Sequence, residues 1–334
     1  MKIYNAAIAG CGRMGSLFSK DPLRKGIVTH AAAYKNLRSV KLIAACALDR
    51  GRLEEFGKTW GVGALYTDIK KMLSEERIDL LSVCTPPSTH HSVVKEAVKH
   101  PIKAIFCEKP LADNVKDAEE MVKLCKEKNI ILQVDHQRRF DPMHINLKGL
   151  INDKKMGEPQ QVNFYYTAGV KNTGSHMFDI LRFFFGDVEW VEAFASKNDS
   201  GKEDDPNLDG ILKFKDGTIA TFQGCDFRKY LIFELNCFLD KGRIMLKDSG
   251  FSLDLYGAEE SKNFSGYNEL LKIRPPFKTD YERNYILNAV KGLLECVKNG
   301  EESSSSGRDG LAVMKIIEAA LSSSKYEGKK IWIN

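Results

Sequence analysis

The segment Tyr-Asn-Ala-Ala-Ile-Ala-Gly-Cys-Gly-Arg-Met-Gly, residues 4–15, indicates the fold of the N-terminal part of the chain. Its first six residues resemble a short buried strand, and they lead directly into the pattern G-x-G-x-x-G. In a dinucleotide-binding turn, Gly10 makes the tight turn and Gly12 lets the backbone approach a pyrophosphate. Gly15 lets the following helix pack close to the strand. A tight turn that binds nothing can have the same residues, so the context decides.

That context is a series of apolar runs separated by amphipathic stretches over the first 135 residues. Strands that are apolar throughout and alternate with helices are typical of a parallel sheet covered on both faces. We therefore predict an α/β fold whose residues 1–137 form a doubly wound Rossmann domain that binds NAD or NADP. The runs are Lys41–Cys46, Leu80–Cys84, Ala104–Cys107 and Ile130–Val134, and the clearest helices are Ser88–Lys99 and Val115–Lys128.

The pattern changes after Arg139, where short alternating segments and turn signals such as Asp216-Gly217 indicate antiparallel hairpins. We predict an α+β domain over residues 138–334, built on a largely antiparallel sheet with one face left for another subunit. Its expected helices are Met143–Asn152, His176–Phe185, Tyr281–Asn299 and Arg308–Tyr326. Its expected strands are Gln161–Thr167, Val188–Ser196, Gly210–Phe214, Thr218–Gln223, Leu231–Phe238, Arg243–Leu246 and Ile331–Ile333.

Composition narrows the class of protein. The 334 residues are 43% hydrophobic and 28% charged, with a formal net charge of +5, which suits a two-domain globular protein and disfavours nucleic acid as a partner. No run approaches the roughly 18 apolar residues that span a bilayer, and the chain enters a strand at once, so we expect neither a membrane partner nor a signal peptide.

Eight cysteines without a C-x-x-C pair indicate a reducing, cytoplasmic setting. His90-His91 lacks a third ligand at suitable spacing, so we expect no metal.

Two features near the glycine loop leave the cofactor open. Ser19–Ile27 interrupts the helical pattern after the loop, as either a cover over the cofactor or a surface excursion. The strand that ends at Cys46 has Ala47 where an acidic residue usually binds the ribose hydroxyls, and Asp49 comes two residues later. If Asp49 cannot reach the ribose, Arg13 and Arg50 are available for a 2′-phosphate, so NAD and NADP both remain candidates.

Three further motifs accompany the glycine loop: Thr85-Pro86-Pro87-Ser88-Thr89-His90, Glu108-Lys109-Pro110, and Gly174-Ser175-His176 followed by Asp179. With this ordered set the chain resembles, over essentially its whole length, the glucose–fructose oxidoreductase/inositol dehydrogenase family, also written Gfo/Idh/MocA. The resemblance implies a homodimer or homotetramer assembled through the second-domain sheet.

The resemblance also implies roles for the motif residues. Lys109 lies near the nicotinamide and the reacting hydroxyl, often before a cis proline, and His176 is the usual acid/base residue. Members commonly have an aspartate four residues before that histidine, where this chain has Asn172. The expected cofactor-binding residues are Gly10, Gly12, Arg13, Met14, Gly15, Asp49, Arg50, Thr85, Pro86, Ser88, His90, Glu108 and Lys109.

These residue types suit alcohol oxidation or its reversal. A neutral imidazole can accept the hydroxyl proton because its reference pKa is about 6.5, and a lysine ammonium stabilises developing alkoxide charge. Asn172 can position an imidazole but cannot stabilise imidazolium by charge, so we expect the proton to move between His176 and Lys109. Asp179, one helical turn later, either orients the imidazole or is a first-turn acid that favours the helix dipole.

Substrate contacts are expected at Lys109, Arg138, Arg139, Tyr166, Asn172 and His176, although core packing is the simpler role for Tyr166. The leading hypothesis is an NAD(P)-dependent oxidoreductase that transfers a hydride between nicotinamide and a secondary hydroxyl of a sugar, cyclitol or nucleotide sugar. Two alternatives remain: redox-neutral isomerisation or glycoside cleavage with a bound cofactor, and a non-enzymatic cofactor-binding regulator.

Overall fold

The computed structural model describes residues 2–333, which divide into two compact units. The first comprises Met1–Asp141 and Glu282–Met314, and the second comprises Pro142–Tyr281 and Lys315–Asn334. The sequence placed residues 282–314 in the second domain together with everything after residue 137. In the structure this segment packs on the first unit.

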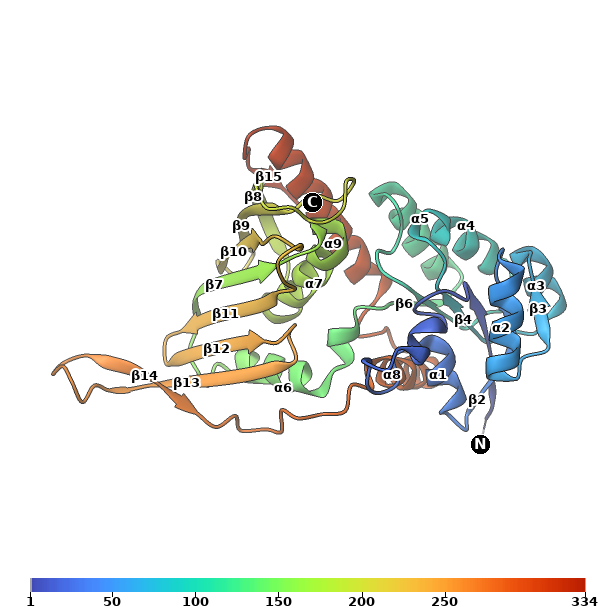
Figure 1. The fold of residues 1–334 in the computed structure, drawn as a ribbon, viewed down its shortest axis with the longest axis horizontal. Coiled ribbons are helices and arrows are strands. Elements are labelled where there is room, and N and C mark those ends of the chain that lie inside the picture. Colours follow the sequence, from blue (N-terminus) through green and yellow to red (C-terminus); the bar gives the residue numbers. More distant parts are fainter. Residues whose placement is uncertain (1, 334) are drawn as a thin grey trace. The chain divides into compact units, whose positions relative to one another are not determined.

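The first unit is built on a six-stranded parallel sheet with the strand order β3-β2-β1-β4-β5-β6. This is the order of a doubly wound nucleotide-binding sheet, so the predicted fold class is confirmed. Figure 1 labels four of these strands, β2, β3, β4 and β6, together with the helices of the same unit. The carboxyl ends of parallel strands meet at one edge, where ligands bind in such sheets. The strands are β1 (Tyr4–Ala9), β2 (Val40–Cys46), β3 (Ala64–Tyr66), β4 (Leu80–Val83), β5 (Ala104–Cys107) and β6 (Ile131–Val134).

Helices cover both faces of this sheet, as strands that are apolar on both faces require. Helices α3, α4 and α5 pack side by side, whereas α1 packs against α8, which arrives from far along the sequence. The Gln133 side chain donates to the carbonyl of Ala289 in α8 at 3.2 Å, which ties α8 to β6. The helices are α1 (His30–Lys35), α2 (Arg50–Trp60), α3 (Ile69–Glu75), α4 (Pro87–Ala97), α5 (Val115–Glu127) and α8 (Tyr285–Asn299).

The insertion after the glycine loop leaves the helical hydrogen-bond pattern on either side of it continuous. The N–H of His30 donates to the carbonyl of Met14 at 3.0 Å, and Ala31 donates to Gly15 at 3.1 Å. Helix α1 therefore resumes the turn that the glycine loop begins, and the intervening segment, with the 3₁₀ turn η1 (Leu17–Lys20), loops out from it. The insertion is anchored in its own unit, because the N–H of Ile27 donates to Asn284 Oδ1 at 2.9 Å.

The second unit contains a nine-stranded sheet with the order β14-β13-β12-β11-β7-β10-β9-β8-β15, antiparallel except for the β7–β10 pair. Helix α7 (Gly174–Phe185) packs on it, and almost all of its residues are buried. The strands are β7 (Pro159–Tyr166), β8 (Val188–Ala195), β9 (Leu208–Phe214), β10 (Ile219–Gly224), β11 (Phe233–Leu239), β12 (Gly242–Lys247), β13 (Ser252–Glu260), β14 (Asn268–Ile273) and β15 (Ile331–Trp332). The remaining helices are α6 (Pro142–Asn152) and α9 (Gly307–Lys325), and α9 begins in the first unit.

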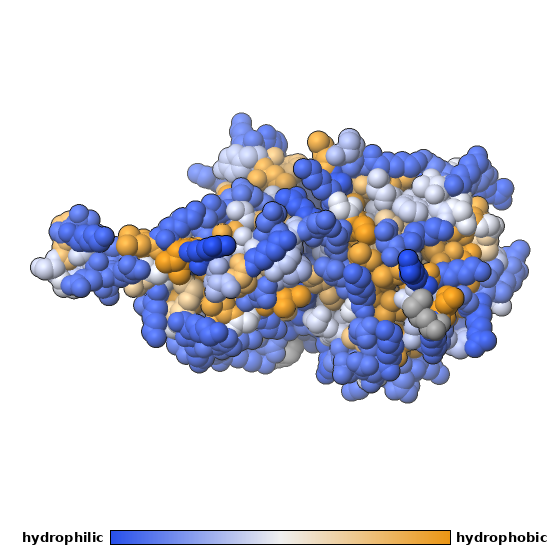
Figure 2. Space-filling view, turned by 90° about the horizontal axis from the view of Figure 1, so that it is seen from below, coloured by the Kyte–Doolittle hydropathy of each residue, from blue (hydrophilic) through white to orange (hydrophobic). Residues whose placement is uncertain are grey.

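Within residues 2–333, no helix has the length and apolar character needed to cross a membrane. Hydrophilic residues dominate the face shown in Figure 2, with smaller hydrophobic areas between them. The largest fully buried side chains include Tyr166 and Phe222, from the neighbouring strands β7 and β10.

Tyr166 is a test of how this second sheet is held together. Its hydroxyl donates to the carbonyl of Leu208 at 2.9 Å and accepts from the N–H of Leu208 at 2.7 Å, and its side chain is fully buried. We expect Tyr166→Phe to lower the free energy of unfolding by about 1–3 kcal/mol, because two buried backbone groups lose their partner. Tyr165→Phe, one residue earlier on the other face of β7, is the control. Equal urea midpoints for the two variants would contradict this prediction.

Candidate cofactor and active site

The glycine loop has the geometry of a dinucleotide cradle. Gly10 has φ +100°, and a Cβ there would lie 2.6 Å from the backbone nitrogen of Thr85. A Cβ on Gly15 would overlap the carbonyl oxygen of Gly10. By contrast, a Cβ on Gly12 would meet nothing within 4 Å. Folding itself therefore requires glycine at positions 10 and 15, whereas the open space at Gly12 suits the close approach of a pyrophosphate.

Thr85 follows β4 and lies against this turn. Its Oγ1 is buried and has no hydrogen-bond partner among the described residues, as expected of a group that awaits a ligand. Pro86 and Ser88 are exposed just beyond it. These residues fit a bound dinucleotide, which would supply the hydride acceptor for the chemistry considered below.

His90 is buried and holds two loops together. Its Nε2 lies 2.8 Å from the carbonyl oxygen of Thr85, and its Nδ1 lies 3.1 Å from that of Pro110 and 3.4 Å from Cys107 Sγ. Burial lowers the pKa of His90 and raises that of Cys107, so both are neutral at pH 7. A neutral imidazole carries one N–H, so it can donate either from Nε2 to the carbonyl of Thr85 or from Nδ1 to that of Pro110. The structure thus gives His90 a positioning role for the predicted cofactor-binding segment.

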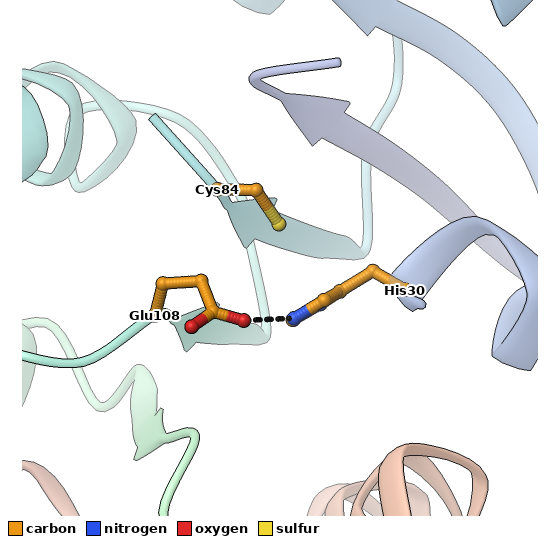
Figure 3. Close-up of side chains that lie close together, drawn as sticks. All are labelled: His30, Cys84 and Glu108. Atoms are coloured by element: carbon orange, nitrogen blue, oxygen red, sulfur yellow. Dashed lines mark hydrogen bonds and ion pairs between the residues drawn. The ribbon is translucent and has the colours of Figure 1, made fainter. Parts of the chain in front are cut away.

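Glu108 and Lys109 follow β5 directly, and the Lys109–Pro110 peptide is cis. Glu108 Oε1 lies 3.0 Å from Nε2 of the fully buried His30 at the start of α1 (Figure 3). On its other side, His30 Nδ1 lies 2.8 Å from Ser82 Oγ. Burial lowers the pKa of His30 to about 4, so the imidazole is neutral at pH 7.

Cys84 points toward the same pair, and the ligand atoms of His30, Cys84 and Glu108 all lie within 4.8 Å of one another (Figure 3). Such a group could hold a metal ion, in contrast to the His90-His91 pair considered from the sequence. However, His30 and Glu108 already hydrogen-bond directly, and burial raises the pKa of the Cys84 thiol well above its usual value. A thiol in that state is a poor metal ligand.

The corner where the adenosine ribose would bind is formed by the end of β2. Ala47 occupies the expected acidic position and offers no side-chain acceptor. Asp49 caps α2 by accepting from the N–H of Arg52 at 3.0 Å, and it also forms an ion pair with the Arg52 side chain. Arg13 and Arg50 are exposed. The carboxylate of Asp49 is therefore already used by the helix.

In the second unit, His176 lies in the first turn of α7, half-buried, and Asp179 is buried in the same helix. The preceding segment is unusual: Ala168 has φ +65°, and Gly169–Thr173 form a turn of π-helix, η3. Conformations of this kind cluster at functional sites. The buried Asp205 accepts the N–H groups of Lys171 at 2.7 Å and Asn172 at 2.9 Å, and so holds this segment in place.

Two other expected substrate residues, Arg139 and Tyr166, have hydrogen-bond partners within their own units. Arg139 Nη1 donates to the carbonyl of Ser304 at 2.9 Å and lies 3.1 Å from Asp309 Oδ1, and both Arg138 and Arg139 are buried. The hydroxyl of Tyr166 is saturated by Leu208, so its position matches the core role and leaves no donor for a substrate.

Sequence reasoning missed four residues that shape these sites: His30, Ser82, Asp135 and Asp205. Asp135 carried a usable signal, because it stands directly after β6 at the ligand-binding edge of the sheet. His30, Ser82 and Asp205 had none, because the hydrogen-bond partners of their side chains all lie at least 33 residues away along the chain.

Residues 4–136 match the oxidoreductase family GFO/IDH/MocA with its NAD-binding Rossmann fold, and residues 168–244 match the GFO/IDH/MocA C-terminal domain. The chain belongs to this family. It is an oxidoreductase with an NAD-binding Rossmann domain, which confirms the resemblance inferred from the motifs.

Two curated proteins and one solved structure are similar to this chain over nearly its whole length. It is 26% identical to a D-apiose dehydrogenase of Paraburkholderia graminis, over 99% of this chain and 90% of that protein. It is also 26% identical to a myo-inositol 2-dehydrogenase of Thermotoga maritima, over 94% of both. The crystal structure of an oxidoreductase from Agrobacterium radiobacter in complex with NAD⁺, L-tartaric acid and magnesium superposes with a TM-score of 0.80 at 20% identity, covering 99% of this chain and 98% of that one.

The glycine loop yields a pair of contrasting variants. We expect Gly12→Ala to fold with a normal melting temperature and to lose most of its dinucleotide affinity, because its methyl group enters only the space that a pyrophosphate needs. Gly10→Ala should melt at a lower temperature even without cofactor, because its methyl group collides with the backbone of Thr85. Thermal unfolding and NAD⁺ titration measure the two effects. Normal binding of NAD⁺ by Gly12→Ala would show that the pyrophosphate does not bind against Gly12.

Proposed function

We propose that this protein is an NAD(P)-dependent dehydrogenase or reductase that acts on a secondary hydroxyl of a sugar, cyclitol or nucleotide sugar, with Lys109 and His176 handling the proton. The supporting observation is the edge of the first sheet, where the open glycine turn, the unpartnered Thr85 hydroxyl and Lys109 follow neighbouring parallel strands. The names of the apiose and inositol dehydrogenases support a polyhydroxylated substrate.

The chemistry divides between cofactor and protein. The nicotinamide takes or gives the hydride, and the chain's own groups manage the hydroxyl proton. A lysine ammonium stabilises the alkoxide that develops on the substrate oxygen, and a neutral imidazole accepts the proton. Asn172 positions the imidazole or the substrate hydroxyl through hydrogen bonds and adds no charge, and Asp179, one helical turn after His176, orients the imidazole.

Two alternatives share this machinery. A bound cofactor could be reduced and reoxidised within one cycle of isomerisation or glycoside cleavage, or the fold could serve only for sensing. Product formation without net reduction of NAD⁺ would favour the first alternative, and cofactor binding without turnover would favour the second. Cytoplasmic location and homo-oligomeric assembly remain predictions.

Kinetics of single and double variants test the proton roles. We expect Lys109→Met and His176→Asn each to lower kcat/KM by about 100-fold or more on whichever sugar or cyclitol the wild type turns over, because each removes a group that acts in the transition state. The double variant should lose much less than the product of the two single effects if both groups serve one proton transfer. Lys116→Met, at an exposed position of α5, is the control. Near-normal turnover by His176→Asn would eliminate this mechanism.

The choice of cofactor can be tested at the end of β2. We expect Ala47→Asp to lower the ratio of kcat/KM with NADP⁺ to kcat/KM with NAD⁺ by about 10-fold or more, because a carboxylate there binds the ribose hydroxyls and repels a 2′-phosphate. Thr59→Asp adds the same single negative charge at an exposed position near the other end of α2 and controls for charge alone. An unchanged ratio in Ala47→Asp would mean that the ribose does not lie at this corner.

A further inference from the structure

Two buried carboxyl groups meet beside the backbone of Lys109. Asp135 follows β6 and is 2% exposed, and its side chain hydrogen-bonds to Glu108, which follows the neighbouring strand β5. Nothing in the proposed reaction requires a second acid at this place. Two ionised carboxylates in contact would repel each other strongly in a buried site, so their protonation has to be derived.

Three groups contact the carboxyl of Glu108: the backbone N–H of Lys109, the side chain of Asp135, and His30 Nε2, which lies 3.0 Å from Oε1. An ionised carboxylate can only accept, so the neutral His30 must carry its proton on Nε2. His30 Nδ1 then accepts from Ser82, whose oxygen accepts from the hydroxyl of Tyr34 at 2.7 Å. The hydrogen bonds therefore all run in one direction and end on Glu108.

Asp135 must consequently be the donor within the pair. Its Oδ1 is buried and has no hydrogen-bond partner among the described residues. An unpartnered carbonyl oxygen of a neutral acid costs far less than an unpartnered oxygen of a carboxylate. Burial, followed by the negative charge of Glu108, raises the pKa of Asp135 well above its usual value. Burial also raises the pKa of Glu108 above its usual value, but less than that of Asp135, because Glu108 accepts hydrogen bonds from Asp135 and from the backbone N–H of Lys109.

We propose that Asp135 is a positioning residue that holds one proton, shared with Glu108, and thereby fixes the carboxylate that binds the backbone of Lys109. The pair carries a single negative charge next to the ammonium group of Lys109. This inference rests on the proposed function only in treating Lys109 as catalytic.

Other titratable groups surround the pair. Cys84 and Cys107 come from the ends of β4 and β5, and His30 and Tyr34 come from α1. Tyr285 comes from α8. Burial is the main cause that raises the pKa of Tyr285, and the charges of Arg138 and Asp135 also affect it. Cys84, Cys107, Tyr34 and Tyr285 all have pKa values raised by burial, and His30 has a lowered one, so these five groups are neutral near pH 7. Because these five groups are uncharged, the shared proton and the charge of Lys109 determine whether Glu108 is ionised.

Infrared difference spectroscopy tests the proton directly. We expect the wild-type protein, at pH 7 and without substrate, to show the carbonyl stretch of a protonated carboxyl that is absent from Asp135→Asn. The band does not depend on turnover, so its absence would overturn the shared proton even if Lys109 proved to be catalytic, and its presence would stand even if the proposed reaction failed.

Stability as a function of pH provides a second measurement. A carboxyl whose pKa is raised in the folded state contributes stability at low pH and loses it as pH rises toward the folded pKa. Asp135→Asn keeps a neutral donor that cannot ionise, so it does not lose this stability as the pH rises. The melting temperature of the variant minus that of the wild type should therefore increase by about 3 °C or more between pH 5 and pH 8. A constant difference would overturn the proposal.

Asp205 is the matched control, because it is also a buried aspartate with a pKa raised by burial. It accepts two backbone N–H groups, so Asp205→Asn places an amide donor against a donor and should destabilise the protein at pH 7 and above. At pH 8 we therefore expect Asp205→Asn to be clearly more destabilised than Asp135→Asn. Destabilisation of the same size in both would show that Asp135 is an ionised acceptor.

Kinetic rescue separates positioning from general stability. We expect Asp135→Ala to lower kcat/KM by about 10-fold or more, and Asp135→Asn to recover most of that loss, because the amide can still donate to Glu108. Metal analysis of the purified protein completes the test. A stoichiometric divalent ion that is lost in His30→Asn would overturn the proposal, because His30 and Glu108 would then be ligands and not a hydrogen-bonded pair.

Discussion

The first unit depends on one close approach, the backbone of Gly10 against the backbone that follows β4. Any side chain at position 10 would push these segments apart, and the positive φ of this residue favours glycine independently. The contact places the glycine turn beside Thr85, and His90 then bridges Thr85 to the loop that follows Lys109. The ends of β1, β4 and β5 thus become one continuous surface. A cofactor bound there would meet groups fixed by backbone packing and by a neutral imidazole, which does not change charge at physiological pH.

Both units use a buried carboxyl group to hold the backbone next to a candidate catalytic side chain. In the first, Glu108 accepts the N–H of Lys109, and in the second, Asp205 accepts the N–H groups of Lys171 and Asn172. Such groups are costly to bury, and they lower the total free energy only when their hydrogen bonds are well formed. What the protein gains is a single conformation for segments that are otherwise irregular, including a cis peptide and a left-handed alanine. Loops that carry catalytic groups need this support, because small displacements cost large factors in rate.

The strands of the first sheet were predictable because they are short, apolar on both faces and separated by turn residues, and the motifs added the location of Lys109 and His176. The errors also have physical causes. Helices α2 and α3 are rich in charged residues and β3 has only three residues, so their periodicity is weak. The β13–β14 hairpin is largely exposed at its outer strand, which removes the alternation that marks a strand. Helix α8 was assigned to the second domain because nothing in a linear pattern shows which sheet an amphipathic helix will cover. The contacts of His30 with Glu108 and of Asp205 with Asn172 join segments far apart in sequence, so no spacing rule could reveal them.

The distribution of charge bears on how a proton would move. Asn172 replaces the aspartate that the family pattern has before the histidine, and an amide cannot compensate the positive charge of an imidazolium. The negative charge in the first unit instead lies on the Glu108–Asp135 pair, next to Lys109. Since opposite charges stabilise one another more strongly in a buried site than in water, this arrangement stabilises the positive charge of Lys109. Under the proposed function, the imidazole then passes the proton on without retaining it, and the ammonium carries the electrostatic share of transition-state stabilisation.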